Sequence, residues 1–261
     1  MKKLLSALCV FALLLSITGC AEKNSEPTIL RSFLAGYEEN VDENGVAERS
    51  SRVLLNLMSD GTAEFYVGVL DHGTHTTARY SGTYSMGENE ELDETVTLSY
   101  TYADGKTAEV TEAAIVDAIF EMPFYLSGGM TSNAIRFYET APAEMDGDVF
   151  VGYMTKVGGM GPMVYCYSLC LKNSGDFHVS IMQMASVMHV FGATHGTYTT
   201  DGENVTFTYD IRTTEGEVVS AGEIAEGTGY NGVNLSTAFN IEQATMRASA
   251  AQFIRVTEKG E

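Results

Sequence analysis

Basic side chains are scarce in this sequence. Its 261 residues include 15 Lys and Arg against 35 Asp and Glu, which gives a formal net charge of −20. A protein that binds nucleic acid needs a basic footprint to meet the phosphate backbone, and a field of this sign also repels anionic lipid headgroups. We therefore expect no nucleic-acid partner.

The acidic side chains gather in two polar stretches. We interpret both as solvated surface loops. A calcium loop places oxygen ligands at fixed alternate positions around a turn glycine, and neither stretch has that spacing. The two groups are Glu38, Glu39, Asp42 and Glu43, and Glu88, Glu90, Glu91, Asp93 and Glu94.

Long apolar runs are also rare, and the one at the start is too short to span a bilayer comfortably. It covers residues 4–17, follows Lys2 and Lys3, and ends in Ile17-Thr18-Gly19-Cys20. This pattern predicts an export signal over residues 1–19 rather than a membrane helix. The last four residues resemble a bacterial lipobox, and the resemblance implies cleavage before Cys20 and lipidation of its thiol. The alternative is an ordinary secretory signal with an incidental cysteine.

Lipidation at Cys20 would fix the location of the protein. Several acyl chains such as palmitate on one residue exceed the single-chain limit for stable anchoring. Loss of Lys2 and Lys3 leaves 13 basic side chains against 35 acidic ones, a charge of −22. We expect an extracytoplasmic body in water and a membrane anchor, either on the outer face of a Gram-positive membrane or in the outer membrane and periplasm.

Cysteines are too few for a disulfide framework. Cys9 leaves with the predicted signal and Cys20 takes the lipid, so only Cys166 and Cys170 remain. On a strand, four residues separate their α-carbons by about 13 Å, which is beyond the reach of a disulfide. The chain must therefore rely on packed cores.

The common catalytic motifs are missing as well. We find no Gly-x-Ser-x-Gly elbow, no phosphate loop and no His-Glu-x-x-His. The glycines within residues 157–161 precede a predicted strand, whereas a dinucleotide site needs a helix there. His72 and His75 flank Gly73 in what we interpret as a solvated turn. We expect neither an enzyme nor a cofactor.

What the chain does contain is an internal repeat. Residues 79–84, with the sequence RYSGTY, return 114 positions later as residues 193–198, with the sequence ATHGTY. Matches in one order and at nearly one spacing predict a duplicated domain with insertions confined to loops. The other matches are Phe33 with Phe150, Gly36-Tyr37 with Gly152-Tyr153, Leu55 and Leu57 with Leu169 and Leu171, Gly61 with Gly175, residues 96–100 with 205–209, and Ile135-Arg136 with Ile254-Arg255.

The repeat and the positions of proline and glycine predict the domain boundaries. Residues 20–31 form a polar, proline-containing tether, and residues 32–140 form the first domain. Residues 141–148 are a short linker, and residues 149–261 form the second domain. Domains joined so closely should touch. We expect a monomer.

A period of two dominates each repeat and indicates antiparallel strands. Apolar residues alternate with polar ones through residues 96–102 and 205–211. Residues 53–69 and 167–181 each indicate a hairpin, and residues 134–138 and 253–257 a closing strand. One helix is predicted over residues 112–122, capped by Thr111, with a weaker counterpart within residues 236–247. The fold class is all-β, with at most one short helix in each domain.

Antiparallel strands of this number can hide their edges by closing into a barrel. Each repeat resembles a small lipocalin-like, calycin-type barrel, in which a Gly-x-Trp near the start packs against an arginine on the last strand. The matching residues are Gly36-Tyr37 with Arg136 and Gly152-Tyr153 with Arg255. Tyrosine replaces the family's tryptophan, which this chain lacks. A two-sheet sandwich is the other fold considered.

The lipocalin resemblance implies a cavity for a small apolar or amphipathic ligand. A solid barrel used as a surface or interaction module is the alternative, because small barrels are often filled by their own side chains. Large inward residues would favour the solid barrel, whereas small or polar inward residues near one mouth would favour a ligand site. The residues that could line such a mouth or simply pack are Tyr80, Tyr84, Tyr100, Tyr102, Tyr165, Tyr167 and Tyr198.

A remoter hypothesis is a soft-metal site in the second domain. Leu171 and Phe177, on the two strands of its hairpin, are both expected to point inward. This predicts a register in which Cys170 lies opposite His178 and Cys166 lies opposite Met182. All four side chains would share one face, close enough to hold copper(I) or zinc. The competing interpretation is that two thiols and a thioether cover a half-buried surface.

Overall fold

The computed structural model has strands joined by turns and loops, and no helix, in the residues that it describes; the predicted export signal with Cys20 lies outside them. The described part is residues 26–43, 47–102, 105–126, 129–158, 161–185, 188–200, 205–213, 218–220, 230–231, 239–240, 245–248 and 251–259. No helix within it is long and apolar enough to cross a membrane.

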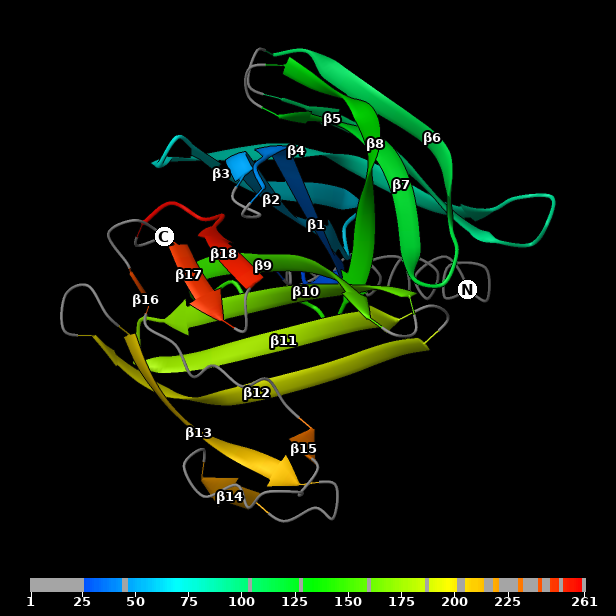
Figure 1. Ribbon diagram of the computed structural model, residues 1–261. Helices are drawn as coiled ribbons and strands as arrows, with labels where there is room; N and C mark the ends of the chain where they lie inside the picture. Colours follow the sequence, from blue (N-terminus) through cyan, green and yellow to red (C-terminus); the bar gives the residue numbers. More distant parts are fainter. Residues whose placement is uncertain are drawn as a thin grey trace, which may run out of the picture.

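Two antiparallel sheets follow one another along the chain (Figure 1). The first contains β1 (Ile29–Val41), β2 (Ala47–Met58), β3 (Thr62–Asp71), β4 (Thr74–Glu88), β5 (Glu94–Thr101), β6 (Thr107–Ile115), β7 (Ile119–Leu126) and β8 (Gly129–Thr140). The second contains β9 (Gly147–Gly158), β10 (Gly161–Lys172), β11 (Asp176–Ala185), β12 (Met188–Thr200), β13 (Val205–Thr213), β14 (Val218–Ser220), β15 (Tyr230–Asn231), β16 (Phe239–Asn240), β17 (Thr245–Ala248) and β18 (Ala251–Arg255).

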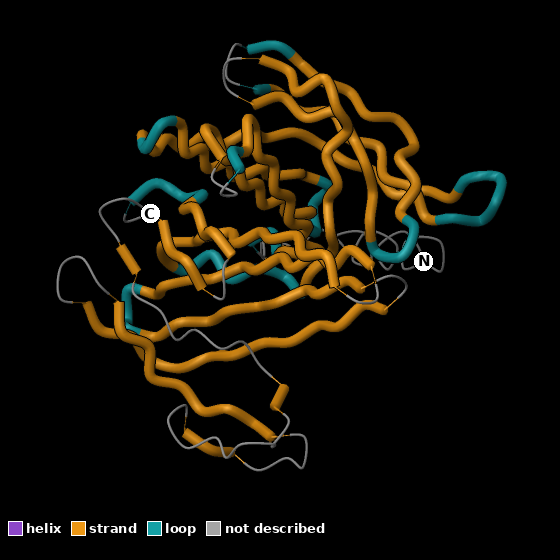
Figure 2. Tube along the Cα trace, viewed as in Figure 1, coloured by secondary structure: helices purple, strands orange, loops and turns teal. Residues whose placement is uncertain are grey.

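The first sheet curls into a nearly closed barrel. Its strand order is β6-β5-β4-β3-β2-β1-β8-β7, so the first and last strands in sequence are hydrogen-bonded neighbours. The two ends of this order, β6 and β7, approach one another through a bridge between Val116 and Ile119. Figure 2 shows how strongly the strands coil around the interior. The curling leaves little of the sheet edge unpaired.

The second sheet starts on the same plan. Strands β9 to β13 are successive neighbours, and β18 returns to pair with β9 as β8 does with β1. The strands between β13 and β18 are short, and the intervening segments lie outside the described residues. The all-β prediction is therefore confirmed, and the first barrel-like sheet with it.

The registers of the two sheets repeat, as the sequence matches predict. Across the inner face of the first sheet, Phe33, Leu55, Phe65 and Tyr80 are paired in one row. The corresponding row in the second sheet is Phe150, Leu169, Val179 and Thr194.

The repeated segments Gly82–Tyr84 and Gly196–Tyr198 have a structural role in both sheets, because each reaches the hairpin turn that precedes it. In these turns Gly61 and Gly175 have left-handed backbone conformations, with φ of 83° and 89°. The Tyr84 hydroxyl donates to the Met58 carbonyl oxygen at 2.9 Å, and the Tyr198 hydroxyl donates to that of Lys172 at 2.8 Å. Each tyrosine thus ties its strand to the preceding hairpin turn. The most conspicuous sequence repeat is explained by folding.

Residues 112–122 correct the helix prediction. They belong to β6 and β7, which are joined by a turn at Val116–Ala118 in which Asp117 and Ala118 have φ of 52° and 60°. The apolar spacing that suggests one helical face comes from two strands. Each strand alternates apolar and polar residues, and the turn between them offsets the two alternations so that together they resemble a helical spacing. The second, weaker helix prediction covers residues 236–247. Residues 239–240 and 245–247 of this segment are strands, and the others lie outside the described part.

The arginine contacts that the lipocalin resemblance implies are also wrong. Tyr37 points inward, whereas Arg136 lies on the outer face of β8 and pairs with Glu121. In the second half, the guanidinium over the Tyr153 ring is that of Arg52, at 5.6 Å from the ring centroid. The strand registers explain the failure, because they place Gly36 opposite Arg52 and Tyr153 opposite Cys166.

The same registers revise two matches of the repeat. Arg52 and Cys166 are equivalent positions, so Gly36 corresponds to Tyr153 and not to Gly152. Phe33 pairs with Glu139 and Phe150 pairs with Arg255, so Arg255 corresponds to Glu139 and not to Arg136. A slip of one residue reverses the face on which a side chain lies.

Side chains fill the interior of the first sheet. Seven buried aromatic residues form a connected set of ring contacts, with centroids separated by 4.6 to 6.4 Å. Leu55, Leu57, Val67, Val96 and Leu98 pack among these rings. The seven aromatic residues are Phe33, Phe65, Tyr80, Tyr100, Phe120, Phe124 and Phe137.

A second core joins the two sheets through their outer faces. Leu34, Leu54 and Tyr138 of the first sheet pack with Val149 and Val151 of the second, among others. A Cβ atom on Gly36 would lie 2.1 Å from the Tyr153 ring, so a larger side chain would prevent this approach. The expected contact between the two halves is therefore an apolar core.

Candidate functional site: the two ends of the first sheet

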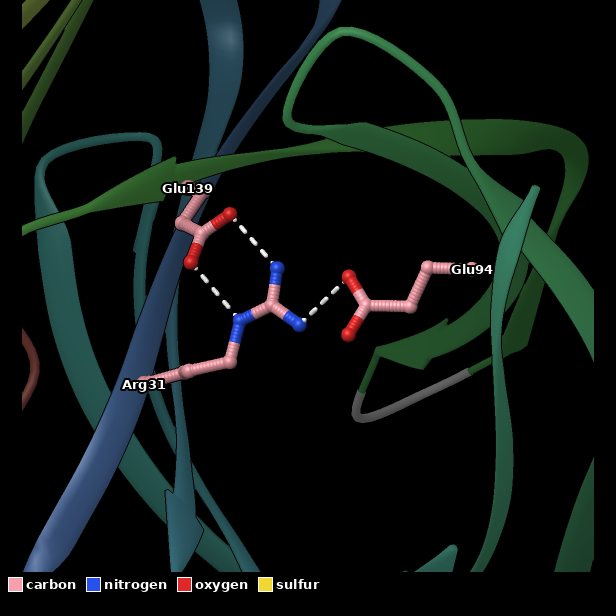
Figure 3. Close-up of polar contacts among 3 residues, drawn as sticks. All are labelled: Arg31, Glu94 and Glu139. Carbon is pink, nitrogen blue, oxygen red and sulfur yellow. Dashed lines mark hydrogen bonds and ion pairs between the residues drawn. The ribbon is translucent and has the colours of Figure 1, made fainter. Parts of the chain in front are cut away.

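The end of the first sheet where the tether enters is closed by ionic side chains. Arg31 is the last inward residue of β1 at this end, and its guanidinium lies 5.2 Å from the centroid of the Phe33 ring. It donates to Glu139 on the neighbouring strand through two nitrogens, at 2.7 and 2.6 Å. A third nitrogen donates to Glu94 of β5 at 2.8 Å, across the opening (Figure 3).

This cluster, which we call the ionic plug, is a structural seal. Arg31 is 23% exposed and Glu139 is 25% exposed, so the paired groups are partly shielded from water. The hydrogen bond to Glu139 is the main reason that the pKa of Arg31 is raised. Bidentate arginine–carboxylate pairing fixes geometry as well as charge. Glu94, which the sequence analysis places in a solvated surface loop, thus helps to close one end of the barrel-like sheet.

The opposite end of the same sheet is polar and hollowed. Inward-facing Glu39, Arg49, Asp71 and Thr74 form one row across β1 to β4, which we call the polar mouth. Arg49 Nη1 lies 3.8 Å from Glu39 Oε2. A pocket of about 390 Å³ opens here. The sequence prediction named neither Arg49 nor Asp71.

His72 is held by carboxylates beside this mouth. Its Nδ1 lies 2.7 Å from Asp71 Oδ1, and its Nε2 lies 2.7 Å from Glu48 Oε1. The hydrogen bond with Asp71, followed by that with Glu48, raises the pKa of His72. The prediction that His72 lies in a solvent-exposed turn agrees with the structure, in which its side chain is 68% exposed.

The other histidine of this turn belongs to the contact between the halves. His75 Nε2 donates to the Arg255 carbonyl oxygen at 2.9 Å, and burial lowers the pKa of His75. Burial also lowers the pKa of His178. The two half-buried rings are therefore held neutral near pH 7, whereas the His72 ring is held charged to a higher pH.

These opposite shifts predict a histidine titration order. The raised pKa of His72 means that its pairs stabilise the fold below about pH 6.5 and are lost as pH rises through its folded pKa. The lowered pKa values of His75 and His178 mean that their contribution is present above about pH 6.5 and is lost as pH falls. NMR titration of the ring protons should show His72 titrating at a higher pH than either His75 or His178. A His75 that titrates above His72 would contradict the assigned contacts.

The predicted soft-metal residues lie where the sequence places them. Cys170 is opposite His178 and Cys166 is opposite Met182, the register expected for one shared face. That face packs in the core between the halves, where Cys166 is 0% and Met182 1% exposed. Both cysteines are free. Burial raises the pKa of Cys166, and raises that of Cys170 to about 11.

This environment favours the packing interpretation over the metal hypothesis. A soft metal binds the thiolate, which is disfavoured at neutral pH by these shifts. In the described part of the chain, no group of three or more His, Cys, Asp or Glu side chains is arranged to hold a metal ion. Cys166, Cys170 and Met182 pack in the shared core, whereas His178 is partly exposed, with its Nδ1 3.9 Å from Glu144 Oε1.

The proposed tyrosine lining divides into separate places. Tyr80 and Tyr100 are buried in the first interior, and Tyr102 stacks on Tyr125 at 4.6 Å. Tyr84 lies by the hairpin turn at the tether end. In the second sheet, Tyr167 packs on Phe253, with Tyr165 and Tyr198 against the same core. The tyrosines therefore pack rather than line one mouth.

Comparison with protein families, curated proteins and solved structures finds no match for this chain.

A weak sequence signal marks the polar mouth and the ionic plug. Along β1 the inward positions are Arg31, Phe33, Ala35, Tyr37 and Glu39, so charges stand at both ends of an apolar row. Charged residues that keep the inward parity of a strand are unusual, because that face is normally apolar. On β2 and β3, the charged residues at inward positions are Arg49 and Asp71.

Proposed function

We propose that this protein is a lipid-anchored, extracytoplasmic, non-catalytic protein whose first sheet is a solid scaffold. The filled interior of that sheet is the observation that carries the proposal. Phe65 is 0% exposed and its ring contacts those of Tyr100 and Phe124, and the ionic plug covers one end. A fatty acid within the barrel would have to displace these rings, so an interaction module fits better than a carrier of apolar ligands.

The anchoring part of the proposal rests on sequence. The apolar run over residues 4–17 and the Ile17–Cys20 motif support export and lipidation of Cys20. The strong negative charge supports a body that stays in water, away from anionic headgroups. We place the protein on the outer face of a Gram-positive membrane or in the outer membrane and periplasm.

We further propose that both halves are lipocalin-like barrels in tandem. The support is the shared strand order at the start of each sheet, the paired rows of inner residues, and the two tyrosine-tied hairpins. The predicted boundaries at residues 32–140 and 149–261 belong to this proposal. The irregular segment at residues 141–146, between β8 and β9, agrees with a short linker.

Replacement of Cys20 tests the anchor. We expect Cys20→Ser to move the protein from the membrane pellet to the soluble fraction, because serine offers no thiol for acylation. Metabolic labelling with an alkyne fatty acid should mark the native protein and not the variant. Cys166→Ser, which changes a buried free thiol, is the matched control and should stay with the membrane. If Cys20→Ser pelleted like the native protein, the lipoprotein proposal would be wrong.

A further inference from the structure

Exposed large apolar side chains gather at one end of the first sheet. Among the described residues, the large apolar side chains that are exposed are Leu30, Val41, Met86, Leu92 and Val116. Val41 ends β1 on the side of the polar mouth, whereas the other four lie at the end that the ionic plug closes. Single exposed apolar residues are normal on a soluble protein, but a group of them at one place marks an interaction surface.

The ionic plug brings two of these residues to one place. Leu30 directly precedes Arg31, whose guanidinium donates to Glu94 at 2.8 Å (Figure 3). Val116 directly follows Ile115, and Ile115 is the strand partner of Glu94. Glu94 therefore connects the start of β1 to the turn between β6 and β7. Because the same guanidinium also binds Glu139 of β8, this end of the sheet is held in one arrangement.

The other two apolar residues belong to the hairpin that joins β4 to β5. Glu88 is paired with Glu94 at its base, and Leu92 lies in the tip between them, 79% exposed. Met86 lies further along the same hairpin, where it is paired with Val96. Figure 1 shows the hairpin projecting from the rest of the first sheet. We call the end that carries these four apolar residues the plug face.

The plug face is also strongly acidic. Arg31, which lies there, is already bound to Glu139 and Glu94. Four exposed carboxylates on the hairpin and on the β6–β7 turn form no ion pair with another described residue. The apolar side chains thus stand among negative charges that the fold does not balance. These four acids are Glu88, Glu90, Glu91 and Asp117.

These charges decide which partner fits the plug face. An anionic bilayer would repel the acids, and insertion of Leu92 into any bilayer would take the neighbouring Glu91 out of water without a partner. A second copy of the chain, docked face to face, would set the acids of one copy against those of the other. A protein surface with apolar residues inside a rim of Lys and Arg meets both features of the plug face.

We propose that the plug face is a docking surface for a basic protein partner, with Leu92 and Val116 as its apolar anchors. The unbalanced carboxylates attract the partner and orient it, and burial of the anchors holds it. The ionic plug keeps the segments of the face in place before docking, which lowers the entropic cost of binding. The proposal rests on the interaction role proposed above, for which it names the partner class, and is independent of the lipid anchor.

The chain offers matched variants for the test. Val116→Ser removes an anchor that is 51% exposed, and Val41→Ser makes the same change at the opposite end, where Val41 is 52% exposed. Glu91→Gln removes a charge from the plug face, and Glu43→Gln removes one from an exposed position near Val41. All of these side chains are exposed, so the variants should fold as the native chain does.

The experiment is an amide NMR titration of mature Cys20→Ser protein with three synthetic peptides. The first contains Lys and Leu, the second has Ser in place of Leu, and the third has Glu in place of Lys. We expect saturable binding of the Lys–Leu peptide alone, with shift changes at residues 30, 86–94 and 116. Leu92→Ser and Val116→Ser should each weaken it about threefold to tenfold and Glu91→Gln about twofold, with no change in either control variant.

Several outcomes would overturn the proposal. They are no saturable binding of the Lys–Leu peptide up to about 1 mM, equal binding of the Lys–Ser peptide, shift changes centred on the polar mouth, or equal weakening by Val41→Ser and Val116→Ser. Binding to phosphatidylcholine vesicles that Leu92→Ser abolishes would make a bilayer the occupant instead. Dimerisation in sedimentation experiments that Leu92→Ser abolishes would make it a second copy. The solid interior is tested separately, by fatty-acid titration, and the anchor by Cys20 fractionation.

Discussion

Phe65→Ala is expected to lower the free energy of unfolding by about 3–5 kcal/mol, the usual cost of deleting a buried phenylalanine ring. Phe65 lies at the centre of the filled interior, 4.6 Å from the Tyr100 ring and 5.4 Å from that of Phe124. Neighbouring rings from several strands cannot collapse into the gap without moving the sheet. Such a loss is a large share of the stability of a typical domain.

Chemical denaturation followed by circular dichroism measures this loss. Leu92→Ala is the matched control, because Leu92 is 79% exposed and its loss should change stability by no more than about 0.5 kcal/mol. A Phe65→Ala protein as stable as the Leu92→Ala protein would mean that the interior is not packed as described. The account of a solid barrel would then fail.

Arg52→Ala is expected to cost a similar amount, about 3–5 kcal/mol, because it removes a fully buried guanidinium together with its ion pair to Glu38 in the same sheet and its hydrogen bond to the second sheet. Arg52 is 0% exposed and donates to Glu38 at 2.8 Å. It also donates to the Ser51 carbonyl oxygen at 2.9 Å and to that of Gln252, in the other half, at 3.2 Å. Its guanidinium lies over the Tyr153 ring, 5.6 Å from the ring centroid.

Arg52→Met separates charge from volume. Methionine fills much of the space beside Tyr153 but leaves Glu38 and the two carbonyl oxygens without their donor, so we expect a smaller loss than for alanine. Hydrogen exchange should show faster exchange in β9 and β18 as well as in β2 for Arg52→Ala. If exchange quickened only within the first sheet, the halves would not share a core.

The sequence predicts most of the strand pairing because alternation and turn chemistry are local signals. The hairpins at residues 53–69 and 167–181 and their register follow from inward parity across a glycine turn. The same rule predicts the partners of Cys166 and Cys170, and the structure confirms them. The shared strand order follows from the repeat.

The errors occur where one local pattern supports two structures. Ile115, Val116, Ile119 and Phe120 have spacings that fit one helical face, yet they lie in two strands and the turn between them, where Ile115 and Phe120 are core residues. Isolated apolar spacing over so short a segment does not distinguish these cases. The Gly36-Tyr37 match failed for a related reason, because a one-residue offset within a strand changes the face without changing the composition.

The core between the sheets has a signal in the sequence. Val53, Leu54 and Leu55 are consecutive apolar residues, and Val149 to Val151 are as well. A strand that is apolar on successive positions is buried on both faces. The candidate site is harder to predict, because the polar mouth depends on which strand ends meet. Only the sheet topology brings Arg49, Asp71 and Thr76 together.

A lipid-binding measurement on detergent-free mature Cys20→Ser protein tests the solid interior most directly. Native mass spectrometry should give the mass of the polypeptide alone, and titration with a fluorescent fatty acid such as cis-parinaric acid should show no saturable binding. These results follow if rings fill the first sheet and the ionic plug covers one end. A bound lipid ejected at stoichiometric yield, or saturable uptake of the probe by the folded protein, would contradict the account.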